Sequence, residues 1–501
     1  MPKNLRRLLG YTLDIAWAAI IMLLPITSLP LLSKLAGNTM VAPASIFPLI
    51  WLVLCWFIFY LARRGAIPRE SIPFFFFVCV AIGSSAFAFF LNIPPFKDKT
   101  VFSEEAKAIL TLAIGAAFYL VTASWLSQSK SRLALTLKLI NISGLIILLW
   151  ALVQAVYIFL FKGQYPAALL EFQRLISVRD LFATRVTSFA FEPSWLAQQL
   201  NLLFLPFWLA ATINGWSAFR FRLWKISLEN SLLAVGAVVL FLTSRVGTLG
   251  LLLILAFLII YFNIFLAKRL QKWNMRFFAR QSPAVQKVAN GLLMAATLLV
   301  FLGIYVLGAI ALVYGLSHVD WRLARFFQVT SLAELKFLSS NVYILFNYLA
   351  FAERYVYWVA GWNIFNIYPL LGVGLGNAGF YFQHALPPYS WNLPEVMQVY
   401  FREATLPNIK SLWVRLLAET GIVGFSSFIA WCYVMVKSAW SMRSNTSPLF
   451  KVIGWTGLFV LIAFITEGFS TDTFALPYLW ISLGIVSAAG ALLRNPPKEE
   501  A

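Results

Sequence analysis

Long apolar runs constrain the fold of this chain more than any other feature of its sequence. Runs of about 17 to 25 mostly apolar residues, the length that an α-helix needs to cross a bilayer, recur along the whole chain. Charged residues make up 12% of the sequence, which is about half the share found in soluble domains. We therefore predict an all-α polytopic membrane protein. About twelve spans are expected, at 11–31, 46–62, 73–92, 106–126, 137–161, 194–214, 228–244, 246–267, 290–316, 411–436, 452–468 and 474–493.

Basic residues between the spans predict the orientation of the chain. When the N-terminus is placed in the cytoplasm, every inner segment carries Lys or Arg, as the positive-inside rule requires. This distribution, rather than binding to nucleic acid, accounts for the net charge of +20. We expect both termini to be cytoplasmic and the first apolar run to be a retained helix rather than a signal peptide. The largest inner group is Lys268, Arg269, Lys272, Arg276, Arg280 and Lys287.

One long interruption separates the predicted spans. We found no internal repeat, so we predict a single membrane domain over residues 1–501, with 317–410 as a long extracytoplasmic loop within it. Aromatic and aliphatic residues at helical spacing in 332–357 predict short helices at the membrane surface. Both histidines of the chain, His318 and His384, lie in this loop.

Two arginines stand beside predicted spans on the outer side. Arg185 and Glu192 precede Pro193, a residue that suits a helix start, where a carboxylate is favoured. Arg185 can pair with Glu192 or with an anionic ligand; the alternative is an interfacial arginine beside a helix cap. Arg245 lies in a tight turn between two spans, where an unpaired charge costs roughly 2.5 kcal/mol or more. It therefore needs an anionic partner, unless it simply reaches the lipid headgroups.

A third arginine, Arg354, precedes a glycine-rich stretch at 372–377. Glycines permit a close backbone approach, so successive amides there can cradle a phosphate or a sugar, or the stretch can simply form a tight loop. Further along, Arg415 and Glu419 are four residues apart in a predicted span. We expect these two side chains to pair on one helical face.

Together the outward basic residues predict an anion site. Arg185, Arg245 and Arg354, with Lys410 and Arg402 nearby, can hold a diphosphate bidentately and stabilise it as a leaving group without a metal ion. The spacing of the histidines and carboxylates matches no common metal site, so we expect neither a metal nor a cofactor.

In this order, the residues resemble the bacterial O-antigen ligase and O-antigen polymerase superfamily of polytopic glycosyltransferases. The resemblance implies an undecaprenyl-diphosphate-linked glycan donor at the outer face of the bacterial inner (cytoplasmic) membrane, and a glycan or lipid-linked acceptor. It also implies that Arg185, Arg245 and Arg354 bind the diphosphate. The resemblance covers roughly 185–424. It rests on Arg185 with Glu192-Pro193 and Leu196-Ala197, Ser244-Arg245-Val246-Gly247, Arg354 with Pro369-Leu370-Leu371-Gly372-Val373-Gly374, and Leu417-Ala418-Glu419-Thr420-Gly421-Ile422-Val423-Gly424.

One departure from the family pattern bears on the reaction. Ligases place His-Asn where this chain has Lys410-Ser411, so the histidine that activates their acceptor is missing. This favours a polymerase, or another glycan-transferring relative, and leaves the general base open between His384 and Glu192, with His318 third. We expect Lys410 to contact phosphate instead.

Two other classes of protein remain as alternatives. A transporter or flippase of lipid-linked oligosaccharide also uses many helices with intramembrane charges, but it predicts two related halves, which the sequence does not show. A structural subunit of an envelope complex would use the same charges as anchors.

Overall fold

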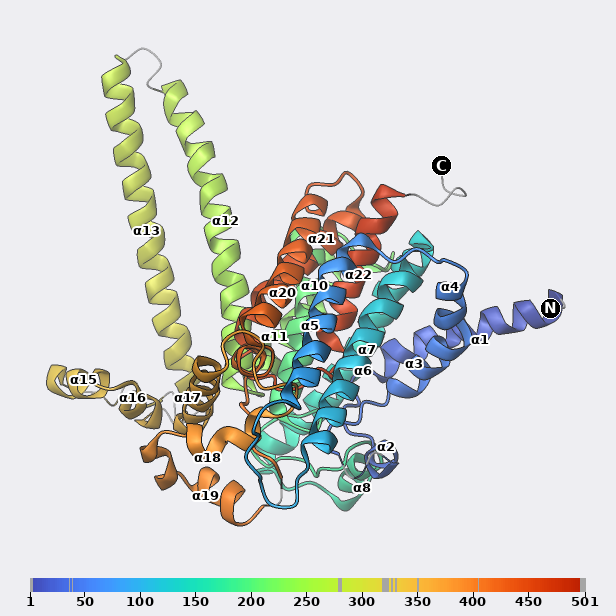
Figure 1. Ribbon diagram of the computed structural model, residues 1–501. Coiled ribbons are helices and arrows are strands. Elements are labelled where there is room, and N and C mark those ends of the chain that lie inside the picture. Colours follow the sequence, from blue (N-terminus) through green and yellow to red (C-terminus); the bar gives the residue numbers. More distant parts are fainter. Residues whose placement is uncertain are drawn as a thin grey trace. The chain divides into compact units, whose positions relative to one another are not determined.

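The computed structural model describes residues 3–35, 37, 39–277, 282–317, 324–325, 328, 331–348, 351–403 and 405–495. These residues form two compact units (Figure 1). Unit 1 comprises 1–251, 357–388 and 398–501, and unit 2 comprises 252–356 and 389–397. The long loop predicted at 317–410 therefore contributes to both units.

The described residues of unit 1 form helices and a short hairpin of strands β1 (Arg222–Leu223) and β2 (Ile226–Ser227). Its helices are α1 (Lys3–Leu23), α2 (Pro30–Leu35), α3 (Ile46–Leu52), η1 (Val53–Phe57), α4 (Ile58–Ala62), η2 (Arg69–Ser71), α5 (Ile72–Ala88), α6 (Val101–Leu126), α7 (Lys130–Leu160), α8 (Ala167–Ile176), α9 (Pro193–Gln199), η3 (Leu200–Phe204), α10 (Leu205–Ile213), α11 (Leu228–Phe241), η5 (Ala378–Tyr381), α18 (Phe382–Ala385), α20 (Leu412–Met442), α21 (Pro448–Glu467) and α22 (Tyr478–Arg494).

Three α-helices in the described part of the chain have residues in both units: α12 (Arg245–Phe277), α17 (Ala352–Ile367) and α19 (Pro394–Phe401). Unit 2 also contains α13 (Pro283–Ser317), α15 (Leu332–Ser339), α16 (Val342–Tyr348) and η6 (Pro388–Asn392), whose first residue still belongs to unit 1. The short helices predicted within 332–357 are thus present as α15, α16 and the start of α17.

The helices confirm the all-α prediction. In the described part of the chain, eight helices are long and apolar enough to cross a bilayer, as a polytopic membrane protein requires. Of the other four predicted spans, three overlap the shorter apolar helices Ile46–Ala62, Leu228–Phe241 and Tyr478–Arg494, and 11–31 overlaps α1 only over 11–23. The eight are Arg69–Ala88, Val101–Leu126, Lys130–Leu160, Pro193–Ile213, Arg245–Lys272, Pro283–Gly308, Leu412–Met442 and Pro448–Glu467.

The most enclosed span of unit 1 is the continuous run α9–η3–α10, which packs against α11, α21 and α22. Trp208 is fully buried in it and donates to the amide oxygen of Asn141 at 2.9 Å. Gly144 and Gly236 leave room for this indole, since a Cβ at either position would lie within 2.8 Å of the Trp208 ring. The π-helical turn η3 lies in the middle of the span, and such turns often mark functional positions.

Candidate functional site

The structure places the segments of Arg185 and Arg245 side by side. The backbone N–H of Val186 donates to the carbonyl of Leu242 at 3.1 Å, which joins the loop before α9 to the end of α11. Three residues after Leu242, Arg245 begins α12, and the Ser244 hydroxyl accepts from the Gly247 amide at 3.2 Å in the first turn. Both arginines are half-buried. The segments that carry these two arginines, about sixty residues apart in the sequence, therefore lie side by side in unit 1.

A buried hydrogen-bond network anchors the first turn of α12. The side-chain amide of Asn201, in η3, donates to the Gly247 carbonyl at 2.7 Å and to Glu467 Oε1 at 2.6 Å. Asn201 and Glu467 are both fully buried, and the Ser470 hydroxyl donates to Glu467 Oε2 at 3.1 Å. A Cβ at Gly247 would lie 2.5 Å from the Cβ of Ala197, so only glycine allows this approach. The network thus fixes the helix turn that carries Arg245.

Lys410 lies beside the same end of α21. The amide of Leu412 and the hydroxyl of Ser411 both donate to the Gly468 carbonyl, one residue after Glu467, at 2.8 and 3.4 Å. Ser411 also caps α20 by accepting from the Val414 amide. The Lys410 ammonium lies 4.9 Å from the ring centre of Tyr357. Hydrogen bonds therefore connect the segments of three basic residues. Arg185 lies next to the end of α11, Arg245 begins α12, and Lys410 lies between the end of α21 and the start of α20.

Glu192 pairs with a different arginine from the one considered in the sequence. Arg179 Nη1 lies 3.0 Å from Glu192 Oε1, and the Ser194 hydroxyl donates to Glu192 Oε2 at 3.1 Å. The guanidinium of Arg179 also lies over Phe182 and Phe191, which fixes its orientation. The predicted alternative in which Arg185 pairs with Glu192 is therefore wrong, because the Glu192 carboxylate pairs with Arg179. Within the described residues, Arg185 forms no ion pair and no side-chain hydrogen bond.

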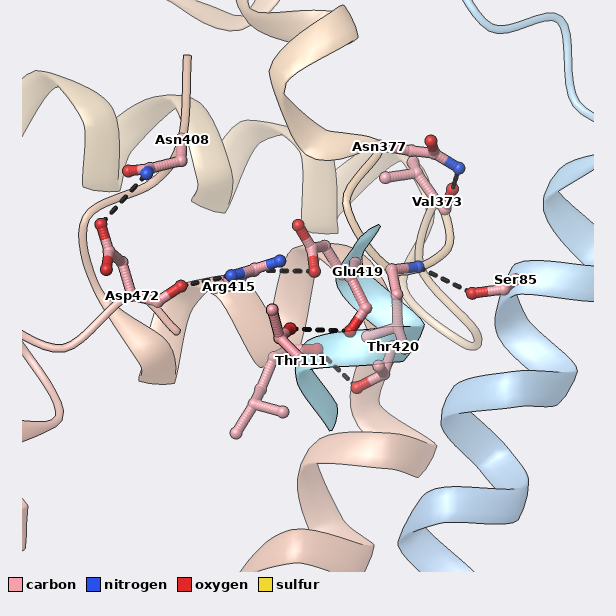
Figure 2. A network of polar contacts seen from close by, with 12 residues as sticks. Ser85, Thr111, Val373, Asn377, Asn408, Arg415, Glu419, Thr420 and Asp472 are labelled. Atoms are coloured by element: carbon pink, nitrogen blue, oxygen red, sulfur yellow. Dashed lines mark hydrogen bonds and ion pairs between the residues drawn. The ribbon is translucent and has the colours of Figure 1, made fainter. Parts of the chain in front are cut away.

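The predicted pair of Arg415 and Glu419 is confirmed. Arg415 Nε lies 2.9 Å from Glu419 Oε2, both side chains are largely buried, and Arg415 also donates to the carbonyl of Asp472 (Figure 2). The Asp472 carboxylate in turn accepts from the side-chain amide of Asn408 at 3.0 Å. These contacts hold the start of α20 against the segment that follows α21.

Two residues after Glu419, the helix α20 is broken. Gly421 has φ 62° and ψ −168°, far from helical values, so the amides of Ile422 and Val423 point away from the preceding turn. They donate instead to the carbonyls of Pro369 and Leu370, at 2.8 and 3.3 Å. The break therefore exchanges two helical hydrogen bonds for two bonds to the loop after α17.

The glycine-rich loop at 372–377 completes this exchange. The amides of Val373 and Gly374 donate at 3.0 Å to the carbonyls of Ala418 and Glu419, which the break left without helical partners. The next amide, that of Leu375, donates to the Ser85 hydroxyl at 3.0 Å (Figure 2). Because these amides already have partners, the expectation that they cradle a phosphate or a sugar is wrong. The glycines serve close packing, and Gly372, Gly374 and Gly376 all have positive φ.

The remaining predicted residues lie on other segments or outside the described residues. His384 is exposed on α18, and Arg402 is exposed after α19, where its amide donates to Gln398. No hydrogen bond or ion pair described here joins either of them to Arg185 or Arg245. Arg354 belongs to unit 2. His318 and the neighbouring Asp320 lie outside the described residues.

Sequence reasoning missed Asn201, Glu467 and Arg179. A signal existed for the first two, because a polar residue inside an apolar run is costly and is therefore functional by default. Within the described ranges, no group of three or more His, Cys, Asp or Glu side chains is placed to hold a metal ion. The sequence matches no family model and no curated protein.

Replacing Asn201 by Ala tests the anchor, by which we mean the hydrogen bonds from Asn201 to the Gly247 carbonyl and to Glu467. The variant leaves a buried carboxylate and a buried carbonyl short of a donor, so we expect it to lower the free energy of unfolding by about 3 kcal/mol. Adding Glu467→Gln should recover part of this loss, because the uncompensated charge is removed. The measurement is reversible unfolding in detergent, with Asn214→Ala, which loses a local bond to Ala210, as a control that changes by less than about 1 kcal/mol. Equal losses in Asn201→Ala and Asn214→Ala would contradict the anchor.

Proposed function

We propose that this protein is a membrane glycosyltransferase that polymerises or transfers undecaprenyl-diphosphate-linked glycan at the extracytoplasmic face during surface polysaccharide biosynthesis. The observation that carries the proposal is the hydrogen bond from Val186 to Leu242, which brings Arg185 next to the turn of Arg245. Lys410 adds a third positive charge on a connected segment. Paired guanidinium groups suit a diphosphate, because each presents two parallel donors to phosphate oxygens.

The arrangement suits the departure of a diphosphate. In the proposed reaction an acceptor hydroxyl attacks the anomeric carbon of the donor, the bond from that carbon to the diphosphate oxygen breaks, and the hydroxyl loses its proton. Negative charge grows on the leaving diphosphate, where fixed cations in a poorly hydrated site stabilise it most. The buried anchor on Asn201 supports this role, since it holds the Arg245 turn in place before the reaction.

The general base is proposed from two residues. Glu192 is the first candidate, because it stands at the start of α9, seven residues after Arg185, and the contacts of its carboxylate with Arg179 and Ser194 orient it. His384 is the second, since its exposed imidazole is accessible to an acceptor. A base must reach the acceptor hydroxyl within hydrogen-bonding distance.

A transporter of the same lipid-linked glycan is the competing proposal, and the break in α20 fits it superficially. Transporters use broken helices whose free amides and carbonyls line a substrate path. Here the backbone of the loop at 369–374 forms hydrogen bonds with the amides and carbonyls at the break, so these groups are not left for a substrate. Vesicles loaded with labelled lipid-linked glycan separate the two proposals, because a transporter moves the label across the bilayer without lengthening the glycan.

Gel analysis of surface polysaccharide tests the proposal in cells. In a strain that lacks the gene, the wild-type protein should restore long chains, whereas Arg185→Ala should not, at equal protein abundance. Arg174→Ala is the matched control, because Arg174 is an exposed outer arginine that pairs with Asp180, and it should restore chain length. Shortened chains in the deletion strain indicate a polymerase, and long chains left on the lipid carrier indicate a ligase. Polysaccharide of wild-type chain length in the Arg185→Ala strain, at equal protein abundance, would contradict the proposal.

A further inference from the structure

Unit 2 contains a groove between two membrane-length helices. The parts of α12 and α13 in this unit form an antiparallel hairpin, in which Asn263 donates to the Tyr305 hydroxyl at 2.7 Å (Figure 1). A cavity of about 110 Å³ lies between them, lined by Ala267 and Gln271 from α12 and by Gly291, Met294 and Phe301 from α13, among others.

Gly291 leaves part of the groove open. A Cβ built on Gly291 would meet no atom within 4 Å, so the space beside this glycine is empty of protein. Most of the lining is apolar; Gln271 and Asn290 line the end nearer the connection between the helices, and Asn263 and Thr297 lie farther from it. The groove is therefore mostly apolar with polar groups at the end near the connection, which suits a phospholipid lying along a helix pair.

Positive charge gathers at that polar end. Lys272 lies five residues before the end of α12 at Phe277, and Lys287 lies four residues after the start of α13 at Pro283, roughly 6 to 8 Å along each helix axis. Lys287 shares a helical face with the lining residues Gly291 and Met294, at spacings of four and seven. Three further exposed cations, Lys268, Arg269 and Arg276, lie within four residues of Lys272 on α12. The sequence has no acidic residue between Glu229 and Asp320, so no carboxylate of this hairpin neutralises them.

We propose that this groove binds one anionic phospholipid of the bilayer, with its phosphate at Lys272 and Lys287 and one acyl chain along Gly291 and Met294. The charge selects the headgroup, because juxtamembrane Lys and Arg gain about 1 kcal/mol each near anionic lipid. The open, apolar length of the groove selects a chain, since burying each CH₂ is worth about 0.8 kcal/mol. This site is separate from the proposed glycan transfer and does not depend on it.

Lipid retained by the purified full-length protein tests the proposal. After exchange into a neutral detergent, native mass spectrometry should show one bound phosphatidylglycerol when phosphatidylglycerol and phosphatidylcholine are added in equal amounts. Lys272→Gln with Lys287→Gln should reduce this adduct at least about tenfold. Gly291→Phe, which fills the groove and keeps every charge, should reduce it as strongly. The matched control, Lys130→Gln with Lys138→Gln, removes two exposed lysines of α7 and should retain the lipid.

Three results would overturn the proposal. One is equal retention of phosphatidylcholine, which removes the role of charge. Another is wild-type retention by Gly291→Phe or by the double lysine variant. The third is displacement of phosphatidylglycerol by equimolar undecaprenyl phosphate, which would assign the groove to the lipid carrier instead. Circular dichroism of each variant checks that a lost adduct does not reflect lost helix.

Discussion

Replacing Arg245 by Ala is expected to weaken binding of undecaprenyl diphosphate by about 100-fold, because truncating a desolvated charge that meets an anion costs roughly 2 to 5 kcal/mol. Arg245→Lys should bind about tenfold more weakly than the wild type, since an ammonium keeps the charge but loses the bidentate fork. Binding to the purified protein in detergent, measured by microscale thermophoresis, reports both changes.

A matched arginine separates this effect from a general loss of charge. Arg402 is exposed on a loop after α19, and Arg402→Ala should change the dissociation constant by no more than about twofold, as expected for an exposed, screened charge. The salt dependence adds a second check, because an exposed charge is screened more than a half-buried one. Wild-type affinity in Arg245→Ala would remove the central member of the proposed diphosphate site.

Replacing Gly421 by Ala is expected to destabilise the protein by about 4 kcal/mol or more, among the largest effects of any single substitution. The backbone at Gly421 has φ 62°, which a side chain rarely adopts, and a Cβ there would lie 2.1 Å from the carbonyl oxygen of Leu370. Relief of this clash requires the loop at 369–374 to move away from α20. Thermal unfolding in detergent and the abundance of the protein in the membrane measure the loss.

Gly83 provides the control for this prediction. It lies in the helix α5, and a Cβ built on it would meet no atom within 4 Å. Gly83→Ala should therefore leave stability unchanged or raise it by up to about 1 kcal/mol, through the greater helix propensity of alanine. If Gly421→Ala unfolds at the same temperature as Gly83→Ala, the break in α20 is not a fixed feature of the fold.

The positions of the helices were predictable from the sequence, because hydrophobicity and helical period are local properties. The pair of Arg415 and Glu419 was predictable for the same reason, since residues four apart on a helix are neighbours. The role of the glycine-rich loop was not. Its glycines are compatible with a ligand cradle or with close packing, and the choice depended on the break at Gly421, about fifty residues further along the chain.

The sequence by itself determined that this chain is built of apolar, membrane-length helices and that arginines stand at the ends of several of them. Only the tertiary structure decided which of the segments that carry these charges lie side by side. A hydrogen bond from Val186 to Leu242 places the segment of Arg185 next to the turn of Arg245. Glu192 forms its ion pair with Arg179. The side-chain amide of Asn201 also links Glu467 to that turn, because it donates to both Glu467 and the Gly247 carbonyl. The physical reason is that a buried donor or acceptor must find a partner wherever packing brings one, and packing joins residues that no local pattern connects.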